Sequence, residues 1–358
     1  APVRRWPTPA LAITISWTSA CPETPSVAVG EATMRAVTQR CYGEPAAVLR
    51  VENLAMPIPG DSEVLIKVRV ASVNPLEWHF TTGKPYLVRA VKGIGAPTRP
   101  RVGYDVAGTV TAVGARVTKF KPGDEVFGGV RGALAEYVVA TEDGDIALKP
   151  AGVPFEQVAA LPIAAVTALQ AVRDHGHVAA GQKVLSIRGS GGGGTYAVQI
   201  ARPFGAEVTA VCSTRNVELV RSIGANHVVD YTKSDFTKDA IQYDLLVDTV
   251  GNHSILALRK AVKPGGTIVG VGGPKDDNWL GPILHGLNRK VVGHFIDQEA
   301  TGFIARVKRH DLEFLAGLLR DGHMTSVIDR HYRLDQTPQA LEYIGSRRAR
   351  GKVLIDIE

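Results

Sequence analysis

The sequence predicts an α/β protein of two domains, in which a strand-rich, barrel-like part precedes a doubly wound parallel sheet. Between residues 34 and 158, apolar and polar residues alternate with a period of two, as in "SEVLIKVRVASV" (62–73), which is typical of half-buried strands. From residue 159 on, short apolar runs alternate with helical stretches, which indicates parallel strands connected by helices. The length of 358 residues also favours two domains.

The individual elements follow from the same patterns. In the first part we expect strands at 62–73, 105–117 and 132–140, separated by turns that contain glycine and proline. A helix with an interior Pro162 is expected at 155–176. Strands are then expected at 183–189, 207–213, 227–231, 243–251, 266–273 and 290–296. Beyond residue 300 the patterns predict helices at 311–322 and 337–346 and strands at 325–332 and 351–357.

The first 33 residues differ from the rest of the chain. They are rich in Pro, Thr, Ser and Ala, and a regular pattern starts directly after Met34. We therefore expect residues 1–33 to be a disordered leader or an artefactual extension. Arg4 and Arg5 before the apolar "ALAITIS" leave a weak targeting signal as the alternative.

Composition limits the classes of function. No apolar run reaches the ~18–20 residues that span a bilayer, so we expect no membrane segment. The three cysteines, Cys21, Cys41 and Cys212, are far apart and odd in number, which predicts neither a disulfide framework nor a zinc site and favours a reducing, cytoplasmic location.

The formal net charge of +6 is concentrated at residues 89–101 and in "SRRARGK" near the end of the chain. Such clusters are either a solvated surface or a field that attracts an anionic cofactor or substrate. No nucleic-acid-binding module is present.

A glycine-rich stretch, "GSGGGGT" (189–195), lies between the apolar run "KVLSI" and the amphipathic "TYAVQIAR". Gly189, Gly191 and Gly194 form the pattern G-x-G-x-x-G, which in a strand–turn–helix context indicates a dinucleotide site. The first glycine permits the tight turn, the second lets the backbone approach a pyrophosphate, and the third lets the helix pack on the strand. The positive end of the helix then faces the phosphates. The alternative is a turn that holds no ligand.

The end of the following strand indicates which dinucleotide is bound. An NAD site usually places an acid about 20 residues after the turn to bind the ribose hydroxyls, whereas this strand ends in Ser213, Thr214, Arg215 and Asn216. Hydroxyl and guanidinium groups bind a 2′-phosphate, which a carboxylate would repel. We therefore predict NADPH as the cofactor, with a solvated Arg215 as the alternative.

The chain resembles the zinc-free quinone oxidoreductases of zeta-crystallin type, in the medium-chain dehydrogenase/reductase superfamily. The resemblance runs from Met34 to Glu358 and is carried by three segments: "GQKVLSIRGSGGGGTYAVQIAR" (181–202), "VGYDVAGTVTAVGARVTKFKPGDEVFG" (102–128) and "SVNPLEWH" (72–79). It implies a GroES-like β-barrel catalytic domain at 34–158 and a Rossmann NADPH-binding domain at 159–298. Residues 299–358 are expected to return and complete the catalytic domain.

The resemblance also implies roles for individual residues. Asn74 is expected beside the nicotinamide and the substrate carbonyl, or else as a cap of its loop. Tyr86 is expected as a substrate-side donor, or as a packing residue. The remaining cofactor contacts that the resemblance implies are Thr167, Ser190, Gly192, Gly193, Tyr231, Val250, Gly270 and Gly272. Thr167 is equally compatible with the core, and Asp248 is expected as a buried structural acid.

Several positions depart from the family pattern. Gly193 stands where valine is usual, Arg188 where a small residue is common, and Pro203 is expected inside the helix after the turn, where it would remove a hydrogen bond.

Metal-dependent relatives carry a cysteine and a His-Glu pair where this chain has Asn74 and Tyr104-Asp105, so no zinc is expected. Without a Lewis acid, hydride transfer to an electrophilic acceptor is easier than the oxidation of an alcohol. The sequence thus predicts a cytoplasmic, homodimeric, NADPH-dependent reductase of quinones or α,β-unsaturated carbonyls, with no nucleic-acid or membrane partner. The alternatives are an NADPH-binding structural or regulatory protein and an enoyl-thioester reductase.

Overall fold

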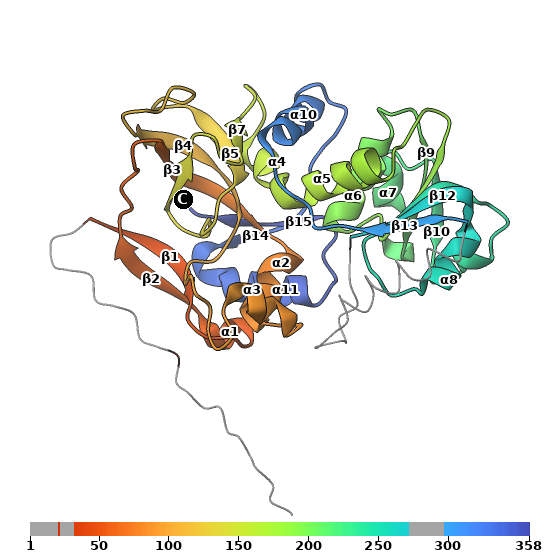
Figure 1. Ribbon diagram of the computed structural model, residues 1–358, viewed down its shortest axis with the longest axis horizontal. Coiled ribbons are helices and arrows are strands. Elements are labelled where there is room, and N and C mark those ends of the chain that lie inside the picture. The colour runs from red at the N-terminus through yellow and green to blue at the C-terminus, as the bar shows by residue number, and fades with distance from the viewer. Residues whose placement is uncertain (1–20, 22–31, 272–296) are drawn as a thin grey trace, which may run out of the picture.

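The computed structural model describes residues 21, 32–271 and 297–358 as two sheet-containing domains that lie side by side (Figure 1). One apolar cluster lies within the first domain and another within the second, and a third joins residues of both domains where helices α4, α5 and α10 lie between them. No helix within the described ranges is long and apolar enough to cross a bilayer.

The first domain is built from strands that pair antiparallel, except for β14 and β15, which pair parallel. In the part of the chain that the structure describes, a seven-stranded sheet has the order β14-β15-β3-β4-β5-β7, with β6 also paired to β3. A separate hairpin joins β1 and β2. The strands of this domain are β1 (Thr33–Gln39), β2 (Leu49–Ala55), β3 (Glu63–Val73), β4 (Asp105–Val113), β5 (Glu125–Gly129), β6 (Tyr137–Thr141), β7 (Ile146–Leu148), β14 (Ile328–Arg333) and β15 (Lys352–Asp356).

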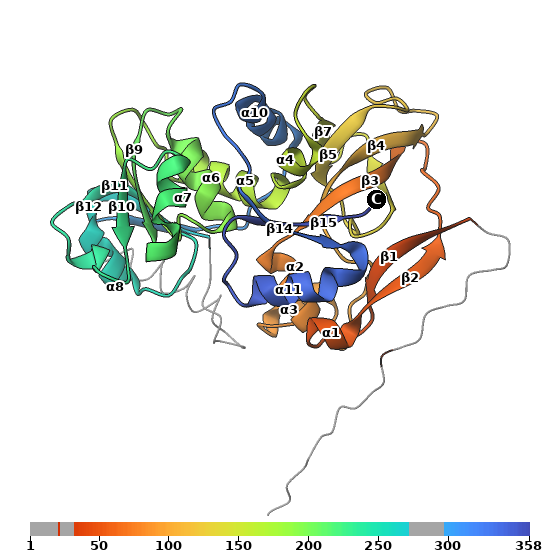
Figure 2. The same cartoon turned by 180° about the vertical axis from the view of Figure 1, so that it is seen from behind.

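The end of the chain returns to this domain. Although β15 lies near the C-terminus, it pairs with β3 in register from Val353 opposite Val73 to Asp356 opposite Val70. Figure 2 shows α11 (Thr337–Gly345) beside the helices of the N-terminal part. This return is what brings residues near 350 to the same place as residues near 74.

The first domain also contains helices that the sequence does not predict: α1 (Pro45–Val48), α2 (Pro75–Thr82) and α3 (Leu87–Lys92). The expectation of strands and turns alone in this part is therefore wrong. Helix α2 starts with a capping box, in which the Glu77 side chain accepts from the backbone N–H of Asn74 at 2.8 Å, and it ends at Gly83 with φ 62°. These signals are present in the sequence, but eight residues are too few for a clear helical period.

The second domain is a parallel sheet. Over the described residues it has six strands in the order β10-β9-β8-β11-β12-β13, which is the doubly wound order with a reversal between β8 and β11. The predicted fold class is thereby confirmed. The strands are β8 (Lys183–Ile187), β9 (Glu207–Cys212), β10 (His227–Asp230), β11 (Tyr243–Asp248), β12 (Val262–Gly270) and β13 (Glu299–Gly302).

Helices cover this sheet and connect it to the first domain. The helices are α4 (Phe155–Ala159), α5 (Pro162–Leu169), α6 (Gly192–Ala201), α7 (Val217–Ser222), α8 (Ile255–Leu258) and α10 (Arg309–Arg320). A π-helical segment spans Gln170–His175, and 3₁₀ turns lie at Thr214–Asn216, Phe236–Lys238, Arg259–Ala261 and Leu334–Gln336.

Two sequence expectations about these helices change, and one about the border of the sheet. The single helix expected at 155–176 is split, because Pro162 lacks an N–H and starts α5 instead of lying inside it. Helix α6 ends at Ala201, so Pro203 lies in the turn beyond it and kinks nothing. Strand β13 pairs with β12, so the chain leaves the Rossmann sheet after residue 302 and not at the expected border of 299.

Further expectations concern the cysteines and the segments outside the described residues. A disulfide joins Cys21 and Cys41, whose Cα atoms are 5.5 Å apart. The expectation of cysteines without a disulfide is therefore wrong for this pair. Sequence spacing does not show which distant cysteines the fold brings together. Cys212 is free and buried. The strand expected at 290–296, Gly272 and nearly all of the leader lie outside the described residues.

Candidate active site

The glycine turn follows β8 and leads directly into α6, as the sequence predicts. A Cβ atom at Gly194 would lie 2.0 Å from the carbonyl oxygen of Arg188, and one at Gly189 would lie 2.8 Å from the Cβ of Ala210. Both distances are shorter than real contacts, so only glycine lets the helix and strands approach this closely. Gly192 and Gly193, in contrast, would place a Cβ no closer than 3.4 Å to any neighbour, so their backbone lies open to the cavity.

The residues around this turn fit a dinucleotide. The first N–H groups of α6 point away from their own helix and suit a phosphate. The Asn216 amide donates to the Ser190 and Ser213 hydroxyls at 2.9 and 3.2 Å, and its buried oxygen Oδ1 has no hydrogen-bond partner among the described residues. A buried acceptor without a donor is unfavourable, and Asn216 does not line the cavity.

Two arginines that the sequence analysis does not assign line the cavity beside the turn. Arg188 takes a left-handed backbone conformation, with φ 61°, and its Nη2 donates to the carbonyl oxygen of Arg347 at 2.9 Å. Burial and the charge of Arg347 lower the pKa of the Arg188 guanidinium. An anionic pyrophosphate beside these cations would offset both effects.

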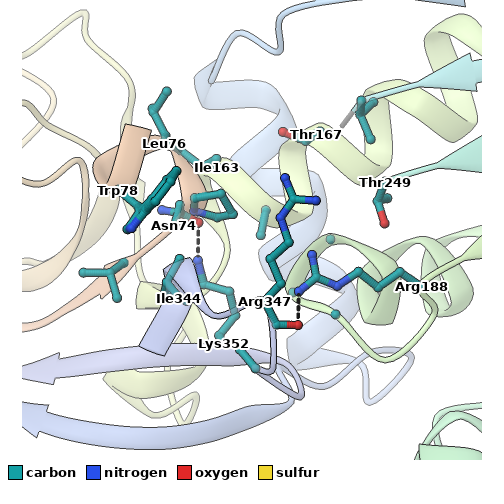
Figure 3. A pocket seen from close by; sticks show the side chains of 18 of the residues that line it. Asn74, Leu76, Trp78, Ile163, Thr167, Arg188, Thr249, Ile344, Arg347 and Lys352 are labelled. Atoms are coloured by element: carbon teal, nitrogen blue, oxygen red, sulfur yellow. Dashed lines mark hydrogen bonds between the residues drawn. The ribbon is translucent and has the colours of Figure 1, made fainter. Parts of the chain in front are cut away.

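The cavity itself has a volume of about 350 Å³ and lies between the two domains. Figure 3 shows Leu76, Trp78 and Ile163 on the side of Asn74, Arg188 and Thr249 on the opposite side, and Arg347 between them. The cavity therefore has an apolar end next to the barrel and a basic end next to the glycine turn. A flat apolar acceptor suits the first end, and phosphates suit the second.

A buried polar cluster forms the floor of the apolar end. Asn74, Asp105 and Lys352 are 2%, 0% and 2% exposed. Lys352 Nζ donates to Asn74 Oδ1 at 2.5 Å and to Asp105 Oδ2 at 3.2 Å, and Asn74 Nδ2 donates to the same Asp105 oxygen at 2.9 Å. The Ser72 hydroxyl and the backbone N–H of Ile163 donate to Asp105 as well. Asp105 is thus saturated with donors, which offsets its burial.

Glu77 adds a second buried carboxyl group to this cluster. Burial and the nearby charge of Asp105 raise the pKa of Glu77 from 4.5 to about 7, and the backbone N–H of Asn74 and the charge of Lys352 oppose that rise. Glu77 does not itself line the cavity, and it touches the site through the backbone N–H of the cavity-lining Asn74.

The structure brings some of the predicted site residues together at the cavity and leaves others outside it. Asn74, Thr167, Gly191, Gly192, Gly193 and Val250 line the cavity. Gly189, Ser190 and Gly194 lie behind them in the turn, and Gly270 ends β12 one residue before the cavity-lining Val271. Tyr86 precedes α3, with its ring 4.8 Å below the Arg89 guanidinium, and does not line the cavity. Its role as a substrate-side donor stays a prediction.

The residues predicted for the adenosine end lie together at the ends of β9 and β10. Ser213 and Arg215 follow β9, and Tyr231, which is 62% exposed, follows β10. The C-terminal segment reaches this edge: Arg215 Nη2 donates to the carbonyl oxygen of Arg348 at 3.3 Å, and Arg350 Nη2 donates to that of Arg215 at 3.5 Å. The basic "SRRARGK" stretch therefore covers the adenosine edge.

Metal ligation finds no support in the part of the chain that is described, where no group of three or more His, Cys, Asp and Glu residues is arranged to hold an ion. Lys352, Arg188 and Arg347 are the residues that the sequence analysis missed. Lys352 ends the basic stretch "SRRARGK" and starts the strand "GKVLIDI", and a lysine at the start of a buried strand was the available signal.

A doubly wound sheet with a glycine turn, facing a barrel across this cavity, defines an oxidoreductase that uses a nicotinamide dinucleotide. Two family models match the chain: the alcohol dehydrogenase GroES-like domain over residues 60–151 and the zinc-binding dehydrogenase over residues 223–355.

Similarity to known proteins shows to which group of oxidoreductases the chain belongs. The chain is 33% identical over 337 residues to 2-methylene-furan-3-one reductase of Solanum lycopersicum, covering 90% of this chain and 79% of that protein. It is 33% identical over 350 residues to the trans-enoyl reductase pgmF of Aspergillus terreus, covering 87% and 92%. The structure of the quinone oxidoreductase from Coxiella burnetii matches with a TM-score of 0.80 and 28% identity, over 91% of this chain and 100% of that one. The chain belongs to the medium-chain dehydrogenase/reductase superfamily, among its quinone oxidoreductase-like members, which bind NAD(P)H.

Proposed function

We propose that this chain is an NADPH-dependent reductase that transfers hydride to a quinone or to an alkene conjugated with a carbonyl group. The observation that carries the proposal is the cavity, which joins the open backbone of Gly191–Gly193 to an apolar end that holds the amide of Asn74. A flat conjugated acceptor in that end would lie next to a nicotinamide whose phosphates lie on the glycine turn.

The residues that line the cavity have different roles in the proposed reaction. When bound, the reduced nicotinamide supplies a hydride. The apolar wall of Leu76, Trp78 and Ile163 excludes water and orients the acceptor, and Asn74 Nδ2 donates to its carbonyl oxygen. In an enone, hydride bonds to the β-carbon, the alkene electron pair shifts into the bond between the α-carbon and the carbonyl carbon, and the carbonyl π pair moves onto that oxygen. A proton from water then bonds to the α-carbon and restores the carbonyl group. In a quinone, one hydride from the nicotinamide and one proton from water together convert the two carbonyl oxygens to hydroxyl groups.

The acceptor class is tested by following NADPH oxidation with menadione, methyl vinyl ketone, crotonaldehyde and chloroacrylate. We expect turnover with at least one quinone or enone. An enzyme that binds NADPH but reduces none of these acceptors would contradict the proposal and would favour a structural or regulatory NADPH-binding protein.

The preference for NADPH over NADH rests on the adenosine edge. Arg215 is exposed there: its guanidinium donates to the carbonyl oxygen of Arg348, and its own carbonyl oxygen accepts from the side chain of Arg350. The nearby acid Asp230 is already engaged, because its carboxylate accepts from the hydroxyls of Thr214 and Thr232. A 2′-phosphate at this edge would meet a guanidinium that has no carboxylate partner in any described ion pair.

Replacing Arg215 with alanine is expected to lower the preference for NADPH over NADH in kcat/KM roughly 10-fold, because one charge-assisted contact contributes about 1.5–3 kcal/mol. Steady-state kinetics with both cofactors measure the change. Arg221→Ala is the matched control: Arg221 is an exposed arginine of α7 that pairs with Glu218, and its loss should leave the preference unchanged. An unchanged preference in Arg215→Ala would show that Arg215 does not read the 2′-phosphate.

An enoyl-thioester substrate is the second candidate, favoured by the similarity to a trans-enoyl reductase. Part of the basic segment 89–101 is engaged with aromatic rings, since Arg89 lies 4.7 Å from the Tyr42 ring centroid and Lys92 lies 3.9 Å from that of Phe80. Crotonyl-CoA separates the two functions, because a thioester reductase would use it more efficiently than crotonaldehyde. The homodimer and the cytoplasmic location stay predictions, and light scattering tests the first.

A further inference from the structure

The buried cluster at the cavity floor joins parts of the chain that are far apart in sequence. Asn74 precedes α2, Asp105 starts β4 and Lys352 starts β15. The bond from Lys352 to Asn74 spans 278 positions and the one from Lys352 to Asp105 spans 247. An ammonium group that is 2% exposed is stable only when its partners compensate its charge. This ion pair is therefore part of the buried cavity floor and not a surface contact.

The two charged groups determine how the Asn74 amide is oriented. An ammonium group only donates hydrogen bonds and a carboxylate only accepts them. Asn74 Oδ1 must therefore face Lys352, and Nδ2 must face Asp105, so the flipped amide is excluded. Figure 3 shows Lys352 pointing directly at the Asn74 side chain from the floor.

This orientation leaves one donor for a ligand. The Nδ2 group has two hydrogens, of which Asp105 accepts one, and no other described residue accepts the second. Asn74 lines the cavity, and its backbone is held as well, because its N–H donates to Glu77 Oε2. The Asn74 side chain is thus held at Oδ1 by Lys352 and at one Nδ2 hydrogen by Asp105, and the Asn74 backbone N–H is held by Glu77.

We propose that Lys352 is a positioning residue of the reaction: by binding Asn74 Oδ1 and Asp105 it keeps an N–H of Asn74 directed at the carbonyl oxygen of the acceptor. This inference rests on the proposed function. As hydride reaches the acceptor, negative charge gathers on that oxygen, and the amide hydrogen already directed there stabilises it without reorganisation. The Lys352 charge behind the amide polarises that same N–H.

The test compares three substitutions of Lys352 in the full chain. Lys352→Met removes the charge and the donors, Lys352→Gln keeps a donor without the charge, and Lys352→Arg keeps the charge with different donor geometry. With menadione or methyl vinyl ketone as acceptor, we expect kcat to fall roughly 10- to 100-fold in Lys352→Met, as a displaced catalytic group does, and by less in Lys352→Gln. The KM for NADPH and the Kd of NADP⁺ from titration calorimetry should stay within about twofold, because Lys352 does not form the glycine turn.

A matched control separates positioning from the loss of a buried cation. Lys149, in the same domain, is 6% exposed and pairs with Glu125 at 2.9 Å, but does not line the cavity. Lys149→Gln should therefore leave kcat per cofactor-binding site unchanged. All rates are expressed per site that binds NADP⁺, so misfolded protein does not count as lost activity.

The arginine variant keeps the test decisive if the neutral variants fail to fold. If Lys352 supplies only structural charge, Lys352→Arg will retain wild-type kcat, and this result overturns the inference. The inference is also overturned if Lys352→Met turns over like wild type, or if Lys149→Gln loses as much kcat. A wild-type protein that reduces no acceptor overturns the proposed function together with the inference, whereas active wild type with unchanged Lys352 variants overturns the inference alone.

Discussion

Substituting Gly194 with alanine is expected to destabilise the second domain by about 3 kcal/mol and to abolish measurable NADPH binding. The added Cβ would lie 2.0 Å from the backbone oxygen of Arg188, and a backbone atom cannot move aside as a flexible side chain can. Overpacking usually costs about 1–3 kcal/mol, and here it also forces α6 away from the strand that positions the phosphate-binding turn. Urea unfolding and fluorescence titration with NADPH measure the two effects.

The neighbouring Gly193 is the matched control for this substitution. A Cβ there comes no closer than 4.0 Å to any neighbour, the carbonyl oxygen of Ala164, and Gly193 lies within α6. Gly193→Ala should raise stability by about 0.5–1 kcal/mol, because alanine is the better helix former. If Gly194→Ala has the same free energy of unfolding and the same NADPH affinity as wild type, the close approach of α6 and β8 does not require glycine. The explanation given for glycine at this position is then wrong.

The substitution Glu77→Gln is expected to change stability in a strongly pH-dependent way. The pKa of Glu77 is raised from 4.5 to about 7 by burial and by Asp105, so between these values the folded chain binds a proton that the unfolded chain has released. The protonated Glu77 side chain therefore contributes to the free energy of unfolding of the wild type. This contribution is fully present below about pH 4.5 and is lost as the pH rises through about 7. A shift of this size corresponds to about 3 kcal/mol at 1.36 kcal/mol per pH unit.

Glutamine also fits the capping box at this position, but it has no charge to bury. The free energy of unfolding of Glu77→Gln relative to wild type should therefore increase by up to about 3 kcal/mol between about pH 5 and about pH 8. Urea unfolding at both pH values measures it. Glu44→Gln, at an exposed glutamate before α1, should show no such pH dependence. A difference between Glu77→Gln and wild type that is the same at both pH values would mean that Glu77 titrates in the folded protein as it does in water.

The cofactor half of the site was predictable because its signal is contiguous. The glycine turn, the strand before it and the helix after it occupy 183–201, and the requirement for glycine at Gly189 and Gly194 follows from local geometry. The tip of β9 was predictable for the same reason, since Ser213 and Arg215 follow the strand directly. The family resemblance added Asn74, which the structure places on the cavity wall.

The acceptor half was less accessible to sequence reasoning. Short helices such as α2 are determined by a cap and a terminal glycine, which local periodicity does not detect over eight residues. The split at Pro162 shows a similar limit, because a proline inside a helical pattern is compatible with a kink or with a new helix start. The tertiary packing of α4 and α5 between the two domains selects the second.

By itself the sequence determined the order of the two domains, the parallel sheet and the glycine turn, because these depend on residues within one strand–turn–helix unit. Only the tertiary structure decided what forms the cavity floor: it brings β15 back to β3, so that Lys352 reaches Asn74 and Asp105. The physical reason is that buried charges are tolerated only in pairs, and the partners of this pair are chosen by strand pairing across the chain, which no local pattern encodes.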